Sequence, residues 1–199
     1  EPWALSLAGA EAWSMLSPGG AAAPTLVGHT AVFDSPRNRM IVFAGYDSNG
    51  VVVSDTWSLS LTGGTSWSKL GPSGVTPGGR SGHQAVYDPA RQRMLVFGGY
   101  EAGGDETWAL SLTGPLAWSQ IPAAGTLPRR RSVATQIVDS PRARVVMFGG
   151  FGTYGPLGDV WTHSLAGPGA WTRMYPGGGH PQLLQHAAVY EPRERREDP

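Results

Sequence analysis

A repeat of paired tryptophans limits the possible folds more than any other feature of this sequence. The eight tryptophans form four pairs, and the two members of each pair are ten residues apart: Trp3 and Trp13, Trp57 and Trp67, Trp108 and Trp118, Trp161 and Trp171. The first members are separated by 54, 51 and 53 residues. An apolar run that ends in a small residue, a glycine and an aromatic recurs with them, as VFAGY (42–46), VFGGY (96–100) and MFGGF (147–151). A fixed period of about 50 residues indicates a propeller or a solenoid array.

Each repeat is predicted to contain four short antiparallel strands, called a to d in chain order. In the best preserved copy they cover 82–87, 93–98, 106–112 and 117–121. These segments are short and β-rich, and none keeps a helical period for long. In strand c, the large residues Trp108, Leu110 and Leu112 alternate with small ones, so the two faces differ. This pattern predicts sheets stacked face to face, with the large side of each against the small side of its neighbour.

Two sets of residues are therefore predicted to be structural. The first is the leading tryptophan of each pair: Trp3, Trp57, Trp108 and Trp161. The second is the glycine doublet that closes strand b: Gly98, Gly99, Gly149 and Gly150. Glycine is expected there because it permits positive φ and lets another backbone approach closely.

At these positions the chain resembles the kelch-repeat β-propeller family. The matching residues are the strand-a opening from Arg80 to His83, the Tyr-Asp before the first turn, the glycine doublet and the spaced tryptophans. The resemblance implies an all-β propeller of four-stranded antiparallel blades. The single domain 1–199 would hold three complete blades at 28–70, 82–121 and 133–174. Split strands would remain at its ends, strands c and d in 1–16 and strand a with its turn in 185–196.

The split ends leave three arrangements open. The chain could be part of a larger propeller, a four-bladed ring closed by its own ends, or half of a ring that two copies share. We expect a larger propeller or a homodimer, because strands patterned for larger rings would need steep blade angles in a four-bladed one. Exchange of identical elements between copies is a low-cost route to such dimers.

The connections between strands divide the predicted propeller into two faces. The a–b and c–d turns are near-copies of one another, whereas the b–c loops differ in length and content (47–54, 101–105, 152–158). In an up-and-down blade, the b–c and d–a loops lie at the same end, so function is expected on that variable face. The candidate ligand-binding residues there are Arg80, Arg130, Arg131, Tyr46, Asp47, Tyr100, Glu101, Phe151 and Tyr154.

Arg80 and Arg131 open strand a at the mouth of the predicted channel. In kelch domains that act as substrate adaptors, arginines at this position recognise acidic peptides. The resemblance implies the same contact here, and guanidinium forks suit carboxylates. The alternative is that both arginines hold one blade to the next. Their charge is expected to have no adjacent acid to offset it.

Histidines recur at one strand-a position, as His29, His83 and His186. A metal-binding ring is one interpretation, but no carboxylates accompany them to orient metal-bound imidazoles. We therefore expect structural histidines, no metal and no cofactor. His163 stands where the other copies have leucine, so it is either hydrogen-bonded in place or lies against a solvent-filled gap.

No catalytic motif is visible. The chain has no cysteine, so it lacks the Tyr–Cys crosslink of radical-copper oxidases of similar architecture. Glu101 and Asp105 match the first two residues of the Glu-x-x-x-Asp-x-x-x-His iron motif of nitrile-forming specifier proteins, but Ala109 occupies the third position. Gly-x-Ser-x-Gly and nucleotide-binding glycine loops are also absent from the sequence.

The amino-acid composition limits the classes of partner that the chain could bind. Fifteen basic and fifteen acidic residues balance, which argues against nucleic acid and anionic membranes as ligands. No apolar run approaches the ~20 residues that span a bilayer. The sequence favours a non-catalytic binding or scaffolding module for a protein or peptide. The alternative is a carbohydrate-active enzyme of the epimerase or lyase type, or a lectin-like sugar binder. The compartment is not predicted.

Overall fold

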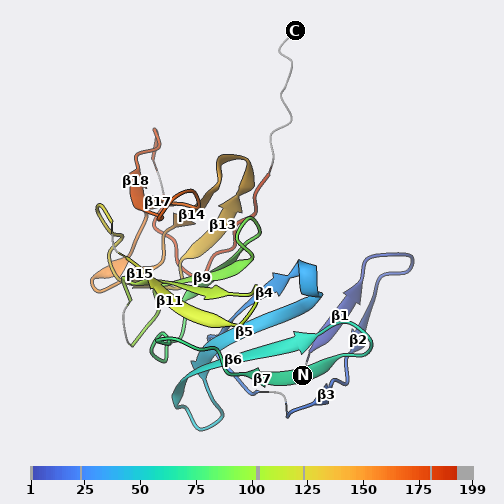
Figure 1. Ribbon diagram of the computed structural model, residues 1–199. Coiled ribbons are helices and arrows are strands. Elements are labelled where there is room, and N and C mark those ends of the chain that lie inside the picture. Colours follow the sequence, from blue (N-terminus) through green and yellow to red (C-terminus); the bar gives the residue numbers. More distant parts are fainter. Residues whose placement is uncertain (1, 23, 102–103, 123, 180, 192–199) are drawn as a thin grey trace.

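The computed structural model describes residues 2–22, 24–101, 104–122, 124–179 and 181–191. Its regular secondary structure is almost entirely β-strand (Figure 1), and the predicted all-β propeller of four-stranded antiparallel blades is confirmed. The two helices in the described part are short 3-10 turns, η1 (Ser35–Arg37) and η2 (Ser140–Arg142). No helix among the described residues is long and apolar enough to cross a membrane.

Three four-stranded sheets follow one another along the chain. Blade 1 contains β4 (Thr30–Asp34), β5 (Arg39–Tyr46), β6 (Val52–Ser60) and β7 (Ser66–Leu70). Blade 2 contains β8 (Gln84–Asp88), β9 (Arg93–Phe97), β10 (Thr107–Ser111) and β11 (Ala117–Ile121). Blade 3 contains β13 (Thr135–Asp139), β14 (Arg144–Phe148), β17 (Val160–Ser164) and β18 (Trp171–Met174).

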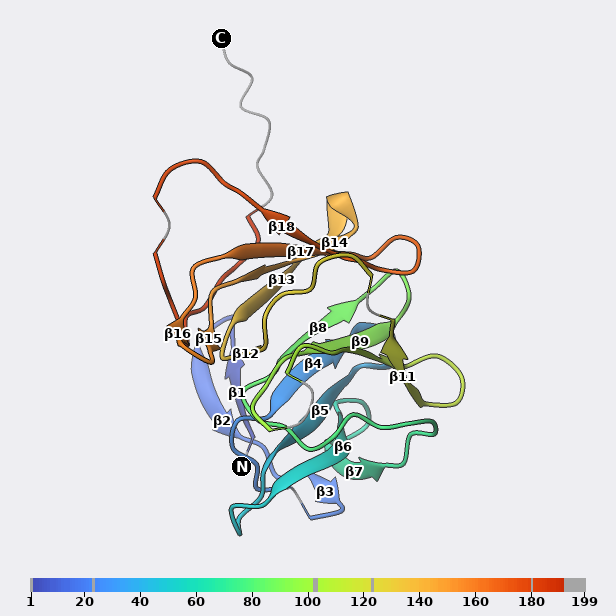
Figure 2. The same ribbon diagram turned by 90° about the vertical axis from the view of Figure 1, so that its left-hand side faces the viewer.

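Smaller elements complete the fold. β1 (Trp3–Ser6) and β2 (Ala12–Met15) form a separate hairpin, and β3 (Gly19–Gly20) adds a parallel strand to β7. A three-stranded sheet joins β12 (Arg131–Ser132), β15 (Phe151–Gly152) and β16 (Gly155–Pro156). Figure 2 shows this small sheet beside blade 3, close to β13.

The first strands of the three blades lie side by side, β4 next to β8 and β8 next to β13. A ladder of backbone hydrogen bonds joins the residues that precede them. The amide of Gly82 donates to Gly28 O at 2.9 Å, that of Val133 to Gly82 O at 2.7 Å, and that of Gln185 to Val133 O at 3.1 Å. All four residues have positive φ. The segment around Gln185 therefore occupies the place where a fourth blade would begin.

The strand expected at the start of that fourth blade does not form. Residues 185–190 continue the inner ladder but form no strand, and no described strand pairs with them. The split blade expected at 185–196 stays a prediction. The remainder of the predicted turn, 192–196, lies outside the described residues.

The glycine doublets allow each blade to approach the next. Gly45 N donates to Arg80 O, and Gly99 N donates to Arg131 O, both at 2.9 Å. Gly99 has a φ of 109°, and a Cβ there would lie 3.1 Å from both Ser81 O and the Cβ of His83. Backbone contact of this kind leaves no room for a side chain.

The blades stack with unlike faces in contact. Trp108 and Trp118 pack with Ile41 and Phe43 of blade 1, whereas Ala109 on the opposite face packs with Val145 of blade 3. The outer-strand indoles of blades 2 and 3 also donate to a threonine of the preceding blade, Trp118 Nε1 to Thr56 Oγ1 at 3.4 Å and Trp171 Nε1 to Thr107 Oγ1 at 2.9 Å. The large-against-small stacking expected from strand c is therefore what the structure contains.

The near-identical a–b turns are held by buried ion pairs. Asp34, Asp88 and Asp139 are almost inaccessible to solvent. The Nε of the arginine five residues later donates to each of them, at 2.8, 2.9 and 2.8 Å. These turns form the scaffold end of the blades, opposite to the variable loops.

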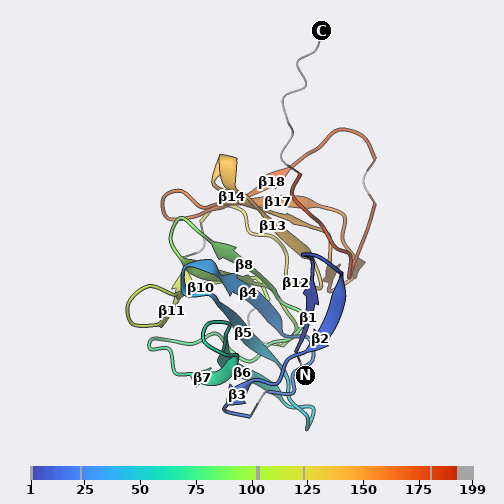
Figure 3. The ribbon, with the colours of Figure 1, turned by 90° about the vertical axis from the view of Figure 1, so that its right-hand side faces the viewer.

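The β1–β2 hairpin lies apart from the core. Figure 3 shows it at one side of blade 1, and among the described residues its strands pair only with each other. Trp3 and Trp13 are 55% and 65% exposed, unlike their counterparts in blades 2 and 3. A cavity of about 700 Å³ separates the hairpin from Ala31, Val42 and Trp67 of blade 1. Among the described residues, the β1–β2 hairpin and the segment around Gln185 do not pair into one sheet.

Candidate functional site

The variable face carries a hydrogen-bond network centred on Glu101. The hydroxyl of Tyr46 donates to the Glu101 carboxylate, and the amide of Ser81 donates to it at 3.2 Å. The guanidinium of Arg130 donates to the Glu101 carbonyl at 2.5 Å. The hydrogen bond to Glu101 raises the pKa of Tyr46. The network joins a loop of blade 1, a loop of blade 2 and the segment that enters blade 3, so it fixes their relative positions.

Asp47 is used within its own loop. Its carboxylate accepts hydrogen bonds from the amides of Asn49 and Val51, both at 2.9 Å. The bond from Val51 is the larger cause that lowers the pKa of Asp47. Since its lone pairs serve the turn, Asp47 contributes to loop shape.

Three aromatic side chains of the candidate set face solvent. Tyr100 and Phe151 are about two-fifths exposed, and Tyr154 is 95% exposed. Tyr154 also borders a cavity of about 140 Å³ together with Arg129, Arg130 and Leu157. The rim of the variable face is therefore aromatic and basic near blade 3.

Arg131 is buried, and its guanidinium is held by contacts within the chain. Its guanidinium makes two hydrogen bonds with Asp159, at 2.5 and 2.9 Å, and donates to Gly149 O at 3.1 Å. Burial would raise the pKa of Asp159, but the hydrogen bonds from Arg131 and from the Trp161 indole outweigh it and lower that pKa. The pair joins the start of strand a to the loop before β17.

Arg80 has the equivalent position between blades 1 and 2. It is fully buried, donates to the carbonyls of Gly78 and Gly98, and lies 3.6 Å from the Glu106 carboxylate. The expectation that neither arginine has an acid nearby is therefore wrong. The cause is the close packing at the glycine doublets. There each guanidinium donates to a backbone carbonyl that the sheet leaves unpaired, Gly98 O for Arg80 and Gly149 O for Arg131. This geometry favours the blade-to-blade role over direct ligand contact.

The recurring histidines also contact neighbouring blades. His83 lies with its Nε2 2.6 Å from Thr30 Oγ1 and packs edge-on against Phe43. His186 packs in the same way against Phe148. Burial lowers the pKa of His83 to about 3, so its ring is neutral at pH 7. Within the described ranges, no three His, Asp or Glu side chains gather in a way that could hold a metal ion.

A cavity of about 840 Å³ lies on the variable face beside blade 3. Leu127, Leu157, Trp161 and Trp171 contribute its apolar side chains, and Arg129, Arg173, Tyr175 and Gln182 contribute polar ones. Arg129 and Arg173 are both exposed. The guanidinium of Arg173 stacks 5.1 Å from the centre of the Tyr175 ring. We refer to this cavity as the blade 3 groove.

Sequence reasoning missed Arg173 and Tyr175. One signal could have found the first of them. Arg173 stands two residues after the second tryptophan, where the other copies have Met15, Lys69 and Gln120. A position that changes chemistry between otherwise similar repeats, near a variable loop, indicates a surface with its own role.

The fold defines a β-propeller, and comparison with known proteins places it more narrowly. Residues 62–194 match the model of the KLHDC2/KLHL20/DRC7 kelch-repeats domain. The chain belongs to the kelch-repeat family. An F-box/kelch-repeat protein of Arabidopsis thaliana is 31% identical over 134 residues, which is 59% of this chain and 27% of that protein. The chain thus spans about a quarter of the length of this relative.

Proposed function

We propose that this chain is a protein-binding module whose blade 3 groove holds an acidic, extended segment of a partner. Kelch repeats generally mediate protein–protein interactions, which supports a binding role. The observation that carries the proposal is the pair of exposed arginines, Arg129 and Arg173, on an apolar groove of the variable face. The proposal keeps the acidic ligand that was expected from the sequence. It differs in the contacts, which are Arg129 and Arg173 and not the buried Arg80 and Arg131.

The chemistry of the groove suits a peptide. A guanidinium donates two parallel hydrogen bonds to a carboxylate, which fixes the orientation of the ligand as well as matching its charge. Tyr175 is exposed and offers a flat surface for an apolar side chain, and the buried Trp171 contributes to the groove lining. Aromatic and arginine residues dominate binding energy at protein interfaces. Arg130 and Tyr154 extend the same rim toward the small cavity.

A sugar-processing or sugar-binding role is the second candidate, and its support is weaker. It would require free carboxylates beside the exposed aromatics. Asp47 and Glu101 accept hydrogen bonds from the loops, and Asp159 accepts them from Arg131. The carboxylates nearest to the groove and rim are therefore occupied by structural contacts.

Selection from a random peptide library displayed on phage tests the proposal. Enriched peptides should be rich in Asp and Glu with one large apolar residue. The double substitution Arg129→Ala with Arg173→Ala should weaken the best peptide by at least ~10-fold, which corresponds to about 1.4 kcal/mol. Titration calorimetry measures this change.

Arg142→Ala provides the matched control, because Arg142 is exposed but lies on the scaffold end of the blades. The affinity of the Arg142→Ala variant for the peptide should equal that of the unchanged chain. Enriched peptides without acidic residues, or full affinity in a folded double variant, would contradict the proposal.

A further inference from the structure

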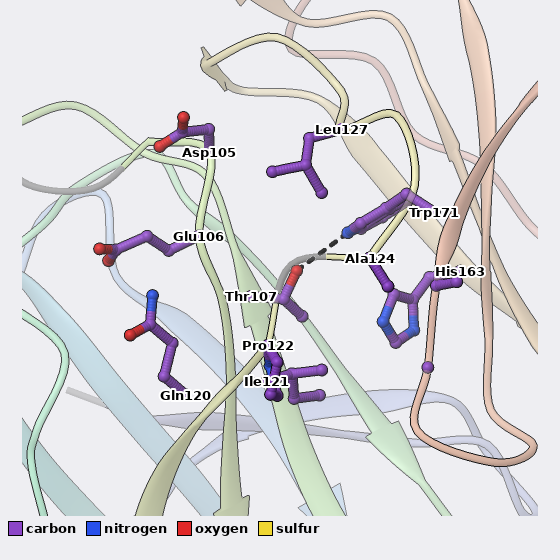
Figure 4. A pocket seen from close by; sticks show the side chains of 12 residues that line it. Asp105, Glu106, Thr107, Gln120, Ile121, Pro122, Ala124, Leu127, His163 and Trp171 are labelled. Atoms are coloured by element: carbon purple, nitrogen blue, oxygen red, sulfur yellow. Dashed lines mark hydrogen bonds between the residues drawn. The ribbon is translucent and has the colours of Figure 1, made fainter.

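A second cavity of about 210 Å³ lies between blades 2 and 3. Figure 4 shows it between Thr107 and Ile121 of blade 2 on one side and His163 and Trp171 of blade 3 on the other. Pro122, Ala124 and Leu127, from the connection between the two blades, also line it. This interblade pocket shares Leu127 and Trp171 with the blade 3 groove but is a separate cavity.

Two positions that are leucine in blade 2 carry other residues in blade 3, and both line this pocket. In blade 2, Leu110 and Leu116 pack in the core against blade 1. The corresponding residues of blade 3 are His163 and Gly169. A Cβ on Gly169 would lie 2.8 Å from Cε1 and 3.0 Å from Nε2 of His163, so the glycine makes the space that the imidazole occupies. The two replacements therefore act together.

The connection over the pocket is also more loosely attached than its equivalents. At blade 1, Ala21 N donates to Trp67 O, and at blade 2, Trp118 N donates to Ser73 O, both at 2.9 Å. Among the described residues 124–128, no backbone hydrogen bond reaches β18. The connection thus spans a space that the other two interfaces fill.

His163 places an unpartnered polar group in this apolar setting. Its side chain is only 2% exposed, and its Nδ1 is buried with no hydrogen-bond partner in the described part of the chain. Burial, with the nearby charge of Arg93, lowers the pKa of His163 to about 4, so the ring is neutral at pH 7. A neutral imidazole has one donor and one acceptor. A buried polar group without a partner costs ~1–3 kcal/mol, which favours any molecule that supplies one.

We propose that the interblade pocket binds a small, uncharged aromatic alcohol of the phenol class. The volume suits one ring, since an apolar cavity of ~150 Å³ in another protein holds benzene. The indole of Trp171 and the side chains of Ile121, Pro122 and Leu127 would enclose the ring, and the hydroxyl would hydrogen-bond His163. A charged ligand is disfavoured, because a buried charge needs a paired partner. The only charged side chains along the lining are Asp105, which is exposed at the rim, and Glu106, which bonds Trp108.

Titration of the folded chain with phenol, followed by nuclear magnetic resonance, tests this inference. The indole N–H signal of Trp171, identified with a Trp171→Phe variant, should shift and saturate in the millimolar range. Toluene, which lacks the hydroxyl, should bind ~3- to 10-fold more weakly, as expected for one hydrogen bond. Absence of a saturable shift with phenol would overturn the proposal.

His163→Leu restores the residue found in the other copies, so it should fold. This variant should still bind toluene but lose the preference for phenol. His29→Leu is the matched control, because His29 is exposed and lies on blade 1, and it should keep the preference. An unchanged preference in His163→Leu would show that the imidazole does not contact the ligand. Since His163 lines the interblade pocket but not the blade 3 groove, the comparison of His163→Leu with the unchanged chain is independent of the peptide experiment.

Discussion

Trp108→Ala should lower the free energy of unfolding by ~3–5 kcal/mol, the usual loss for a large buried aromatic. Trp108 is 5% exposed, and it packs between blades 1 and 2 with Met94, Val96 and Trp118. Its indole also donates to the Glu106 carboxylate at 2.9 Å. Removing the ring leaves a cavity in the centre of a blade interface, and the rigid sheets on either side cannot close it. Urea denaturation followed by circular dichroism measures the loss.

Trp3→Ala is the matched control, because Trp3 occupies the same repeat position but is 55% exposed. Its replacement should cost less than ~1 kcal/mol, as for surface residues in general. Equal losses in the two variants would mean that the hairpin is packed as tightly as the blades. A loss below ~1 kcal/mol for Trp108→Ala would contradict the stacked-blade core itself.

Arg131→Met should destabilise the chain by a comparable amount, ~3–5 kcal/mol, because it removes one partner of a buried ion pair. The Asp159 carboxylate would keep only the Trp161 indole as a side-chain donor, and Gly149 O would lose its hydrogen bond from the guanidinium. Arg130→Met is the control on the same loop. Arg130 is exposed, so its loss should be within ~1 kcal/mol.

The second substitution Asp159→Leu, added to Arg131→Met, should recover part of the loss by removing the unpaired carboxylate. Thermal and urea denaturation of the three variants and of the unchanged chain measure the recovery. If Arg131→Met instead keeps full stability but loses peptide affinity, then Arg131 contacts the ligand, as the sequence alone had implied.

The repeat made most of the fold predictable. A strand is recognised by its own residues, and three or four copies of each strand reduce the ambiguity that one copy carries. The glycine doublets, the Asp–Arg turns and the alternation along strand c each have a local physical cause, so the sequence alone predicts them. The missing strand at 185–190 was not predictable in the same way, because strand formation depends on a partner and not only on the segment itself.

The site was less predictable because it depends on which residues meet across blades. Arg131 and Asp159 are 28 residues apart, and nothing in the spacing shows that they form an ion pair. The sequence shows that His163 replaces a leucine of the repeat, but its closeness to Gly169 depends on the turn between β17 and β18. The position of Arg173 beside the groove was not predictable, because it depends on the path of the two connections that line the groove. The homodimer and the larger propeller both remain predictions, since one chain does not test them.

Photocrosslinking tests most directly the claim that ligands bind on the variable face at blade 3. A photoreactive phenylalanine derivative would replace Tyr175, which is 81% exposed at the groove, or Thr113, which is exposed at the c–d turn of blade 2. With an acidic peptide selected against the whole chain, position 175 should crosslink strongly and position 113 should not. Strong crosslinking from 113, or none from 175 while the peptide remains bound, would contradict the account.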